Sequence, residues 1–197
     1  MTKENKIAID VVLLLPKKVV DICVKVNNKL SLQSDYPKFE DGYNPHITLG
    51  MGIIKISQVP DLKRKLSGAI QEFRPITLSI DNISGGRMNL FGISKTEELL
   101  NLHEKIMGVL EPIVTYDSSA DKFSGLNPPN EISIGWVRDY KTKHSKAKSY
   151  DPHITLGIGK ISTEINFPIE FTVNQIGLFH LSYYCTCKNE LARFVLS

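Results

Sequence analysis

The sequence predicts an α+β fold of two pseudo-symmetric lobes within one domain that spans residues 1–197. The first observation is the order of patterns along the chain: strand, helix, strand, helix, hairpin, helix and then further strands. The second is an internal repeat, because Pro-His-Ile-Thr-Leu-Gly occurs at Pro45–Gly50 and again at Pro152–Gly157. The third is that no Ser/Gly-rich linker separates the halves. We therefore expect each lobe to contribute one strand of the repeat.

The first half of the chain alternates predicted strands and helices. The apolar run Ile7–Leu15 predicts a strand, and Pro16 both ends it and suits the first turn of the next helix. Apolar residues at helical spacing across 19–30 predict that helix. A polar loop at 35–44 leads into the first copy of the repeat as a strand. One apolar face across 57–73 predicts a second helix.

The second half begins with a predicted hairpin and a third helix. The strand-like runs Ile76–Ser84 and Met88–Ser94 are joined across Gly85-Gly86, which predicts a β-hairpin. The apolar stripe of Glu97–Leu110 then predicts a helix that Pro112 ends.

After residue 110 we expect no further helix. The segment 111–151 contains Pro128-Pro129 and is expected to be irregular, apart from one short strand at Ile132–Val137. The second copy of the repeat is then a strand. Further strands are predicted at Phe167–Val173, Gln175–Tyr184 and Leu191–Leu196.

The composition is typical of an ordinary soluble globular protein. With 42% hydrophobic and 23% charged residues, the chain can bury a substantial core. The apolar run Ile7–Leu15 is too short to span a bilayer. Three cysteines, Cys23, Cys185 and Cys187, are an odd number without metal-type spacing and predict a reducing, cytoplasmic location. We expect a monomer that does not associate with membranes.

Positive charge gathers just before the second copy of the repeat. Between residues 138 and 148, five basic residues accompany the single acidic residue Asp139, while the whole chain carries only +3. This stretch is either a solvated loop or a collar that attracts a phosphate-bearing substrate. Arg87, just past the Gly-Gly turn, is either exposed or able to reach a phosphate. The five basic residues are Arg138, Lys141, Lys143, Lys146 and Lys148.

Each copy of the repeat pairs a histidine with a threonine two residues later. Such residues share one face of a strand, so His46 and Thr48 point together, as do His153 and Thr155. Two imidazoles near neutral pH can serve one reaction as base and acid, and threonine hydroxyls can donate hydrogen bonds to phosphate oxygens. Displacement at phosphorus needs such a pair because the attacking and leaving oxygens lie on opposite sides. The pattern favours a metal-independent phosphodiesterase.

A zinc site is the alternative explanation for the two histidines. Each histidine is followed by a threonine, and this pattern supplies no third strong ligand, which argues against zinc. We therefore expect neither a metal nor a cofactor.

The duplicated His-x-Thr strand motif, with 107 residues between His46 and His153, resembles the 2H (two-histidine) phosphoesterase superfamily. That superfamily includes RNA 2′,3′-cyclic phosphodiesterases, bacterial 2′-5′ RNA ligase-like proteins, and plant and fungal cyclic phosphodiesterases. The resemblance implies two antiparallel sheets with outer helices and a central cleft. It also implies that the two histidines are the general acid and base, and that Thr48 and Thr155 hold the phosphate. The segment 111–151 is longer than in compact RNA-processing members, so it could cap or reshape the cleft.

Three more residues are candidate substrate contacts. Tyr43 and Tyr150 each lie three residues before a motif histidine, where they either pack at a strand entrance or stack on a nucleobase. His180 alternates with apolar positions of a predicted strand and could face the edge of the cleft.

The sequence predicts hydrolysis of a nucleotide or RNA phosphodiester, either a 2′,3′-cyclic phosphate or a 2′-5′ linkage. In one assignment His153 deprotonates water and His46 protonates the leaving ribose oxygen, and the reverse is equally open. One alternative is the same chemistry on a cyclic or 2′-5′ oligonucleotide signal or an RNA 3′ end. Another is a non-catalytic nucleotide-binding module. The modest net charge argues for a nucleotide or short RNA as partner.

Overall fold

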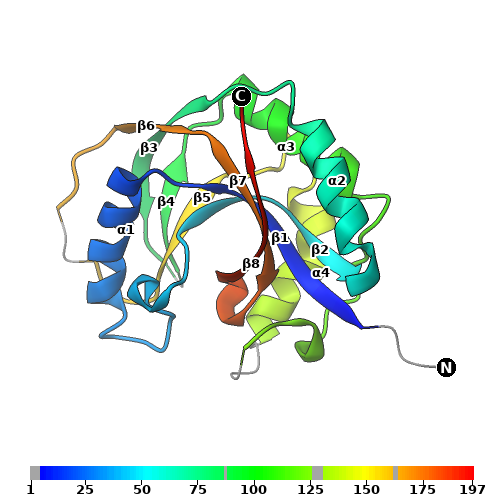
Figure 1. Ribbon diagram of the computed structural model, residues 1–197. Helices are drawn as coiled ribbons and strands as arrows, with labels where there is room; N and C mark the ends of the chain where they lie inside the picture. Colours follow the sequence, from blue (N-terminus) through cyan, green and yellow to red (C-terminus); the bar gives the residue numbers. More distant parts are fainter. Residues whose placement is uncertain (1–4, 87, 126–130, 162–163) are drawn as a thin grey trace.

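The structure is a computed structural model that describes residues 5–86, 88–125, 131–161 and 164–197. This part of the chain forms two four-stranded antiparallel sheets and four α-helices, so the predicted α+β class is confirmed. The two sheets curve around a shared interior, and α1 and α2 lie on opposite outer sides (Figure 1). Arg87 and Pro128-Pro129 lie outside the described residues.

The first sheet has the strand order β2-β1-β7-β8. The central strand β1 is buried almost throughout, because β2 and β7 flank it and both of its faces are covered. A strand buried on both faces has a nearly continuous apolar sequence, as this one has. The strands are β1 (Lys6–Leu14), β2 (His46–Lys55), β7 (Gln175–Leu181) and β8 (Cys187–Val195).

The second sheet has the strand order β5-β4-β3-β6. Strands β3 and β4 are consecutive in the chain and pair with each other across the Gly85-Gly86 turn, as the sequence predicted. The strands are β3 (Ile76–Ser84), β4 (Asn89–Ile93), β5 (His153–Gly157) and β6 (Ile169–Val173).

The two copies of the repeat form the edge strands β2 and β5, one in each sheet. These edge strands contact each other, so segments more than 100 residues apart in the chain lie next to one another. The junction between the two sheets is therefore built from the two copies of the motif.

Each motif strand has an irregular register directly after its threonine. The pairing of β2 shifts between Thr48 and Gly50, and that of β5 shifts between Thr155 and Gly157. Such bulges re-aim side chains and are common beside active sites. Gly50 allows close packing, because a Cβ there would lie 2.6 Å from a methyl group of Leu110. Gly157 has a φ of +134°, which favours glycine.

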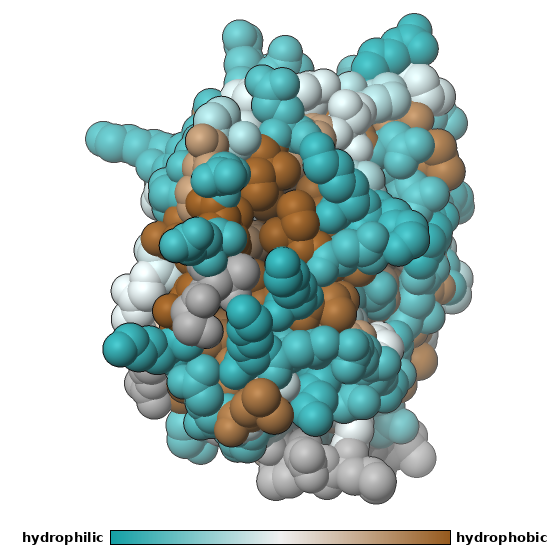
Figure 2. Space-filling view, turned by 90° about the vertical axis from the view of Figure 1, so that its left-hand side faces the viewer, coloured by the Kyte–Doolittle hydropathy of each residue, from teal (hydrophilic) through white to brown (hydrophobic). Residues whose placement is uncertain are grey.

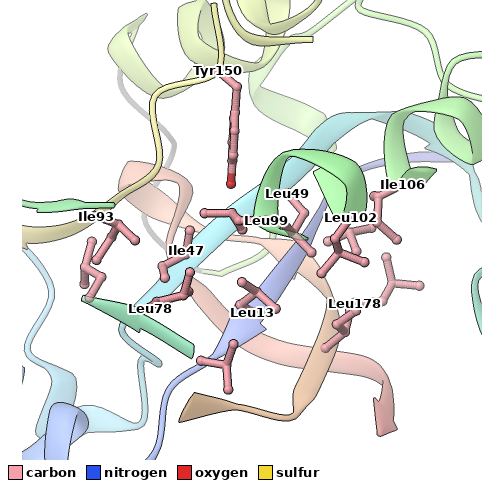
Figure 3. Close-up of a cluster of buried hydrophobic side chains, with 14 of the residues drawn as sticks. Leu13, Ile47, Leu49, Leu78, Ile93, Leu99, Leu102, Ile106, Tyr150 and Leu178 are labelled. Carbon is pink, nitrogen blue, oxygen red and sulfur yellow. The ribbon is translucent and has the colours of Figure 1, made fainter. Parts of the chain in front are cut away.

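The helices α1 (Lys17–Leu30), α2 (Val59–Ala69) and α3 (Glu97–Leu110) occupy the predicted positions. Together with both sheets they enclose one large cluster of buried apolar side chains. Figure 3 shows Leu13 and Ile47 of the first sheet close to Leu78 and Ile93 of the second, with Leu99 of α3 beside them. Both lobes are thus packed on a common core.

Helix α4 (Glu131–His144) corrects the expectation of an irregular segment with one strand at Ile132–Val137. The alternation of Ile132, Ile134 and Trp136 suggested a strand, but these side chains are only partly buried. The buried positions are Ser133, Val137 and Tyr140, which have helical spacing. Because the first of these positions is a serine rather than an apolar residue, the helical pattern of apolar residues was not apparent in the sequence.

The surface is mixed in character. On the side of the molecule that carries α1 and β6, Figure 2 shows a group of hydrophobic residues bordered by hydrophilic ones. Within the described ranges, each helix is too short or too polar to cross a bilayer.

Candidate active site

A cavity of about 430 Å³ opens where β2 and β5 meet, and all four motif side chains line it. His46 and Thr48 come from β2, while His153 and Thr155 come from β5. The intervening residues Ile47, Leu49, Ile154 and Leu156 are fully buried on the opposite faces of the strands. The volume falls within the range of about 300–1,000 Å³ that is typical of ligand pockets.

The two imidazoles are oriented in the same way by the main chain just before their own strands. Nδ1 of His46 lies 2.8 Å from the carbonyl oxygen of Asn44, and Nδ1 of His153 lies 2.8 Å from that of Asp151. A carbonyl oxygen can only accept, so Nδ1 carries the hydrogen in both rings. In the neutral form, each ring therefore has its lone pair on Nε2.

The surroundings of His46 include a buried carboxyl group that the sequence analysis did not single out. Asp10 on β1 is fully buried, accepts a hydrogen bond from Thr48 Oγ1 at 2.8 Å, and lies 3.7 Å from His46 Nε2. Burial raises the pKa of Asp10 well above its usual value, and the hydrogen bond from Thr48 opposes this shift. An aspartate within the apolar run Ile7–Leu15 was the signal that could have identified it.

The environment of His46 favours its neutral form. Its side chain is 16% exposed. Burial lowers the pKa of His46 to about 4, against the effect of the hydrogen bond to Asn44 and with a further decrease from the charge of His153. His46 can therefore accept a proton throughout the neutral range.

Tyr150 lines the cavity and also joins the two motifs. Its hydroxyl donates a hydrogen bond to the carbonyl oxygen of Thr48 at 2.7 Å, and its ring stacks on His103 with centroids 3.8 Å apart. Figure 3 shows the hydroxyl pointing towards the strand that carries Ile47 and Leu49. The side chain is 2% exposed, so most of its surface is committed to packing.

Removal of the Tyr150 hydroxyl should weaken the junction between the sheets. We expect Tyr150→Phe to lower the free energy of unfolding by about 1–2 kcal/mol, since a buried hydrogen bond is lost. Urea unfolding would measure the change. Tyr43→Phe is the matched control and should change stability by less than about 0.5 kcal/mol. Equal stability of Tyr150→Phe and the wild type would show that the bond contributes nothing.

The structure places Tyr43 and His180 away from this cavity. Tyr43 lines a different, more open depression, where the ammonium group of Lys188 lies 4.9 Å from the centre of its ring. His180 is half-buried on β7, with Nε2 2.9 Å from the carbonyl oxygen of Lys122. Neither residue is therefore part of the group that surrounds the two motif histidines.

Helix α4 supplies one wall of the cavity. Its lining residues recur at helical spacing and end in Lys143 and His144. His144 is partly buried, and burial together with the charge of nearby His153 lowers its pKa. The lining residues of this helix are Ile132, Trp136, Asp139, Tyr140, Lys143 and His144.

The basic segment is partly helical and partly a turn. Arg138 and Lys143 both bind Asp139 on α4, at 3.1 and 2.9 Å, and only Lys143 of the five basic residues lines the cavity among the residues that the structure describes. Lys146 and Lys148 are exposed in the turn that leads to β5. The segment thus has one cation at the cavity and two exposed cations in the turn before β5.

Comparison with known proteins identifies the fold. No protein-family model and no curated protein matches the chain. Among solved structures, it is similar to TT0787 of Thermus thermophilus, with a TM-score of 0.58 and 17% identity over 96% of this chain and 98% of that one. It is also similar to LigT of E. coli complexed with 3′-AMP, with a TM-score of 0.56 and 15% identity over 98% and 99% of the chains. A third similar structure is a phosphoesterase, with a TM-score of 0.53 and 15% identity over 98% and 99% of the chains.

Proposed function

We propose that this chain, which has the LigT-like fold of the 2H phosphoesterases, is a metal-independent phosphodiesterase of nucleotides or RNA. The observation that carries the proposal is the convergence of two imidazoles and two threonine hydroxyls on one cavity. The hydrogen bonds at Nδ1 place the lone pair of each ring on Nε2, the nitrogen that would transfer the proton, and in His46 this atom also lies 3.7 Å from the thiol of Cys187. The substrate is a 2′,3′-cyclic phosphate or a 2′-5′ linkage, and residues 1–197 act as one two-lobed domain.

In the proposed reaction, His46 is the general base and His153 the general acid. Nε2 of His46 accepts a proton from water, whose oxygen attacks phosphorus. The bond from phosphorus to the ribose oxygen breaks, and His153 donates a proton to that oxygen. Burial of His46 supports its role as base, because it holds the ring neutral at physiological pH.

The threonines and the cavity walls suit a nucleotide. Thr155 can donate to a non-bridging phosphate oxygen, and Thr48 can do so when its hydroxyl hydrogen turns from Asp10 to the ligand. Lys143 is the nearby cation that can offset the charge of the phosphate. The cavity lining also includes the apolar side chains of Met88 and Trp136, which can receive a nucleobase. LigT of E. coli has been solved with 3′-AMP, NADP+ and ATP, which supports a nucleotide as ligand.

The site favours a short substrate over a long RNA footprint, since the net charge is only +3. The three cysteines are free thiols, which supports a reducing compartment such as the cytoplasm. We propose that the protein acts there as a monomer.

A product assay tests the function. The protein is incubated with 2′,3′-cyclic nucleotides, 2′-5′ and 3′-5′ dinucleotides and cyclic dinucleotides, and the products are identified by mass spectrometry. We expect a phosphomonoester with one new hydroxyl, formed from the cyclic phosphates or the 2′-5′ dinucleotides. Binding of these compounds without any product would instead indicate a nucleotide-binding module.

The same assay after metal removal tests the acid–base chemistry. We expect turnover to be undiminished in excess EDTA, because two imidazoles supply both proton transfers and no step requires a Lewis acid. A loss of activity in EDTA that added Mg²⁺ or Mn²⁺ restores would contradict the proposed mechanism.

A further inference from the structure

His46 has two neighbours that are strong metal ligands as well as being buried. Asp10 on β1 and Cys187 at the start of β8 both lie beside its ring. Among the described residues, these three form the one group of histidine, cysteine and carboxylate side chains whose ligand atoms all lie within 4.8 Å of one another. The third strong ligand that the sequence could not supply is thus present in the fold.

The distances match those of a metal site. His46 Nε2 lies 3.7 Å from Asp10 Oδ2 and 3.7 Å from Cys187 Sγ. Three atoms with this spacing surround a point about 2.1–2.4 Å from each, which is the range of zinc bonds to nitrogen, oxygen and sulfur. A single cation at that point needs no large movement of the three side chains.

The groups behind the three ligand atoms hold them in place. Asn44 accepts the hydrogen from His46 Nδ1, and its own amide nitrogens donate to the carbonyl oxygen of Cys187 at 2.8 and 3.1 Å. Thr48 donates to Asp10 Oδ2. Hydrogen bonds of this kind fix the tautomer of a ligating histidine and the orientation of a ligating carboxylate.

The buried carboxyl group has an unfilled bonding capacity. Asp10 Oδ1 is buried without a hydrogen-bond partner, although its residue is completely enclosed. An unsatisfied buried carboxyl oxygen is costly, and the carboxyl group therefore has capacity for a partner in addition to Thr48, which bonds to Oδ2. Among the described residues, His153 belongs to no such group of three ligand atoms within 4.8 Å of one another, so the surroundings of the two histidines differ chemically.

We propose that Asp10, His46 and Cys187 bind one thiophilic divalent cation, preferentially zinc, and that this cation inhibits the enzyme. The donor set of one nitrogen, one carboxylate oxygen and one thiolate suits zinc and disfavours Mg²⁺ and Ca²⁺. The charges of a carboxylate and a thiolate balance the two positive charges of the ion. Binding releases the thiol proton, and the carboxyl proton where present, to solvent.

Inhibition follows from the position of the ligand atom, and this part of the inference rests on the proposed function. The cation bonds to the lone pair of His46 Nε2, which is the nitrogen assigned to accept the proton from water. A bound cation therefore removes the base without displacing Thr155 or His153. Zinc would act as a reversible switch on a reaction that itself uses no metal.

Direct binding is measured on untagged protein with Co²⁺, Zn²⁺ and Mg²⁺. We expect one equivalent of Co²⁺ to give tetrahedral visible bands and a thiolate-to-cobalt charge-transfer band, both abolished by Zn²⁺ and unaffected by Mg²⁺. Cys187→Ser should lose the charge-transfer band and bind zinc more than about tenfold more weakly. Cys185→Ser is the matched control, since Cys185 is also buried two residues earlier, and it should retain both.

Two results would overturn the metal site: a wild-type cobalt complex without thiolate charge transfer, or equal zinc affinity of Cys187→Ser and the wild type. If Cys187→Ser does not fold, Cys187→Ala and Asp10→Asn replace it, with folding checked by circular dichroism. Zinc inhibition is then measured on the best substrate, and the concentration for half inhibition should rise more than about tenfold in the Cys187 variant. A protein that binds cobalt through Cys187 but has no phosphodiesterase activity would retain the metal site and refute only the function.

Discussion

Replacement of His46 or His153 by alanine is expected to lower turnover of the best phosphodiester substrate by about 10²–10⁴-fold while the fold stays intact. Each ring handles one of the two protons in the proposed reaction, so loss of either ring removes one proton transfer. Steady-state kinetics on purified variants, with circular dichroism to verify folding, measures the effect.

His180→Gln is the matched control for these variants. His180 is also a partly buried strand histidine, but it lies away from the cavity, and glutamine can still donate to the carbonyl oxygen of Lys122. Turnover within about twofold of the wild type is expected. The assignment fails if His46→Ala or His153→Ala has nearly normal activity, and a large loss in His180→Gln would restore that residue as a substrate contact.

The pH dependence of kcat/KM in the wild type should reflect the lowered pKa of the buried base. Because burial lowers the pKa of His46 to about 4, kcat/KM should remain high down to weakly acidic pH and fall only as pH drops towards that value. An acidic limb centred near the ordinary histidine pKa of 6.5 would contradict the role of His46 as base.

Asp10→Asn is expected to change how stability depends on pH. Burial raises the pKa of Asp10 above 3.8, so above that pH the folded protein holds a proton that the unfolded chain has lost. One such proton makes the free energy of unfolding fall by about 1.4 kcal/mol per pH unit as pH rises, until the folded pKa is passed. Asparagine does not titrate, so the variant lacks this decrease.

His46 contributes a slope of the opposite sign. Burial lowers its pKa from 6.5 to about 4, so between these values the unfolded chain binds a proton that the folded protein excludes. Stability therefore rises with pH across that window. In the wild type, the decrease in stability with pH due to Asp10 and the increase due to His46 offset one another wherever their pH ranges overlap. The Asp10→Asn variant lacks the first contribution, so it should reveal the second.

Urea unfolding between about pH 4 and 6.5 tests this prediction. The free energy of unfolding of Asp10→Asn should rise with pH more steeply than that of the wild type, by up to about 1.4 kcal/mol per pH unit, over the part of this range that lies below the folded pKa of Asp10. Asp41→Asn, at an exposed carboxylate, is the control and should keep the wild-type slope. Identical slopes in Asp10→Asn and the wild type would mean that Asp10 is ionised in the folded protein.

The motif strands and three helices could be predicted because their patterns are local. His46 and Thr48 share a face by strand geometry alone, and α3 follows a regular apolar stripe. Helix α4 could not be predicted, since Ser133 occupies one of its core positions and two of its apolar residues, Ile132 and Trp136, line the cavity.

The chemistry around His46 depends on contacts that no local pattern contains. Asp10 precedes His46 by 36 residues, and Cys187 follows His46 by 141. Both reach His46 only because β1 pairs with β2 and because Asn44 at the entrance to β2 bonds to the first residue of β8. The two motifs are identical in sequence, which suggested equivalent surroundings for their histidines. The tertiary structure instead gives the two histidines different neighbours.

Each motif histidine is oriented by the main-chain carbonyl group two positions earlier, just before its own strand, at Asn44 and at Asp151. The orienting carbonyl group is part of the repeated segment itself. A duplicated copy of the segment therefore carries this group with it, irrespective of the surrounding fold. The side chains that set the pKa of a motif histidine, by contrast, belong to other strands. After duplication, the two histidines can therefore keep the same orientation while their pKa values diverge. This allows one copy of the motif to take a specialised role without any change inside the hexapeptide.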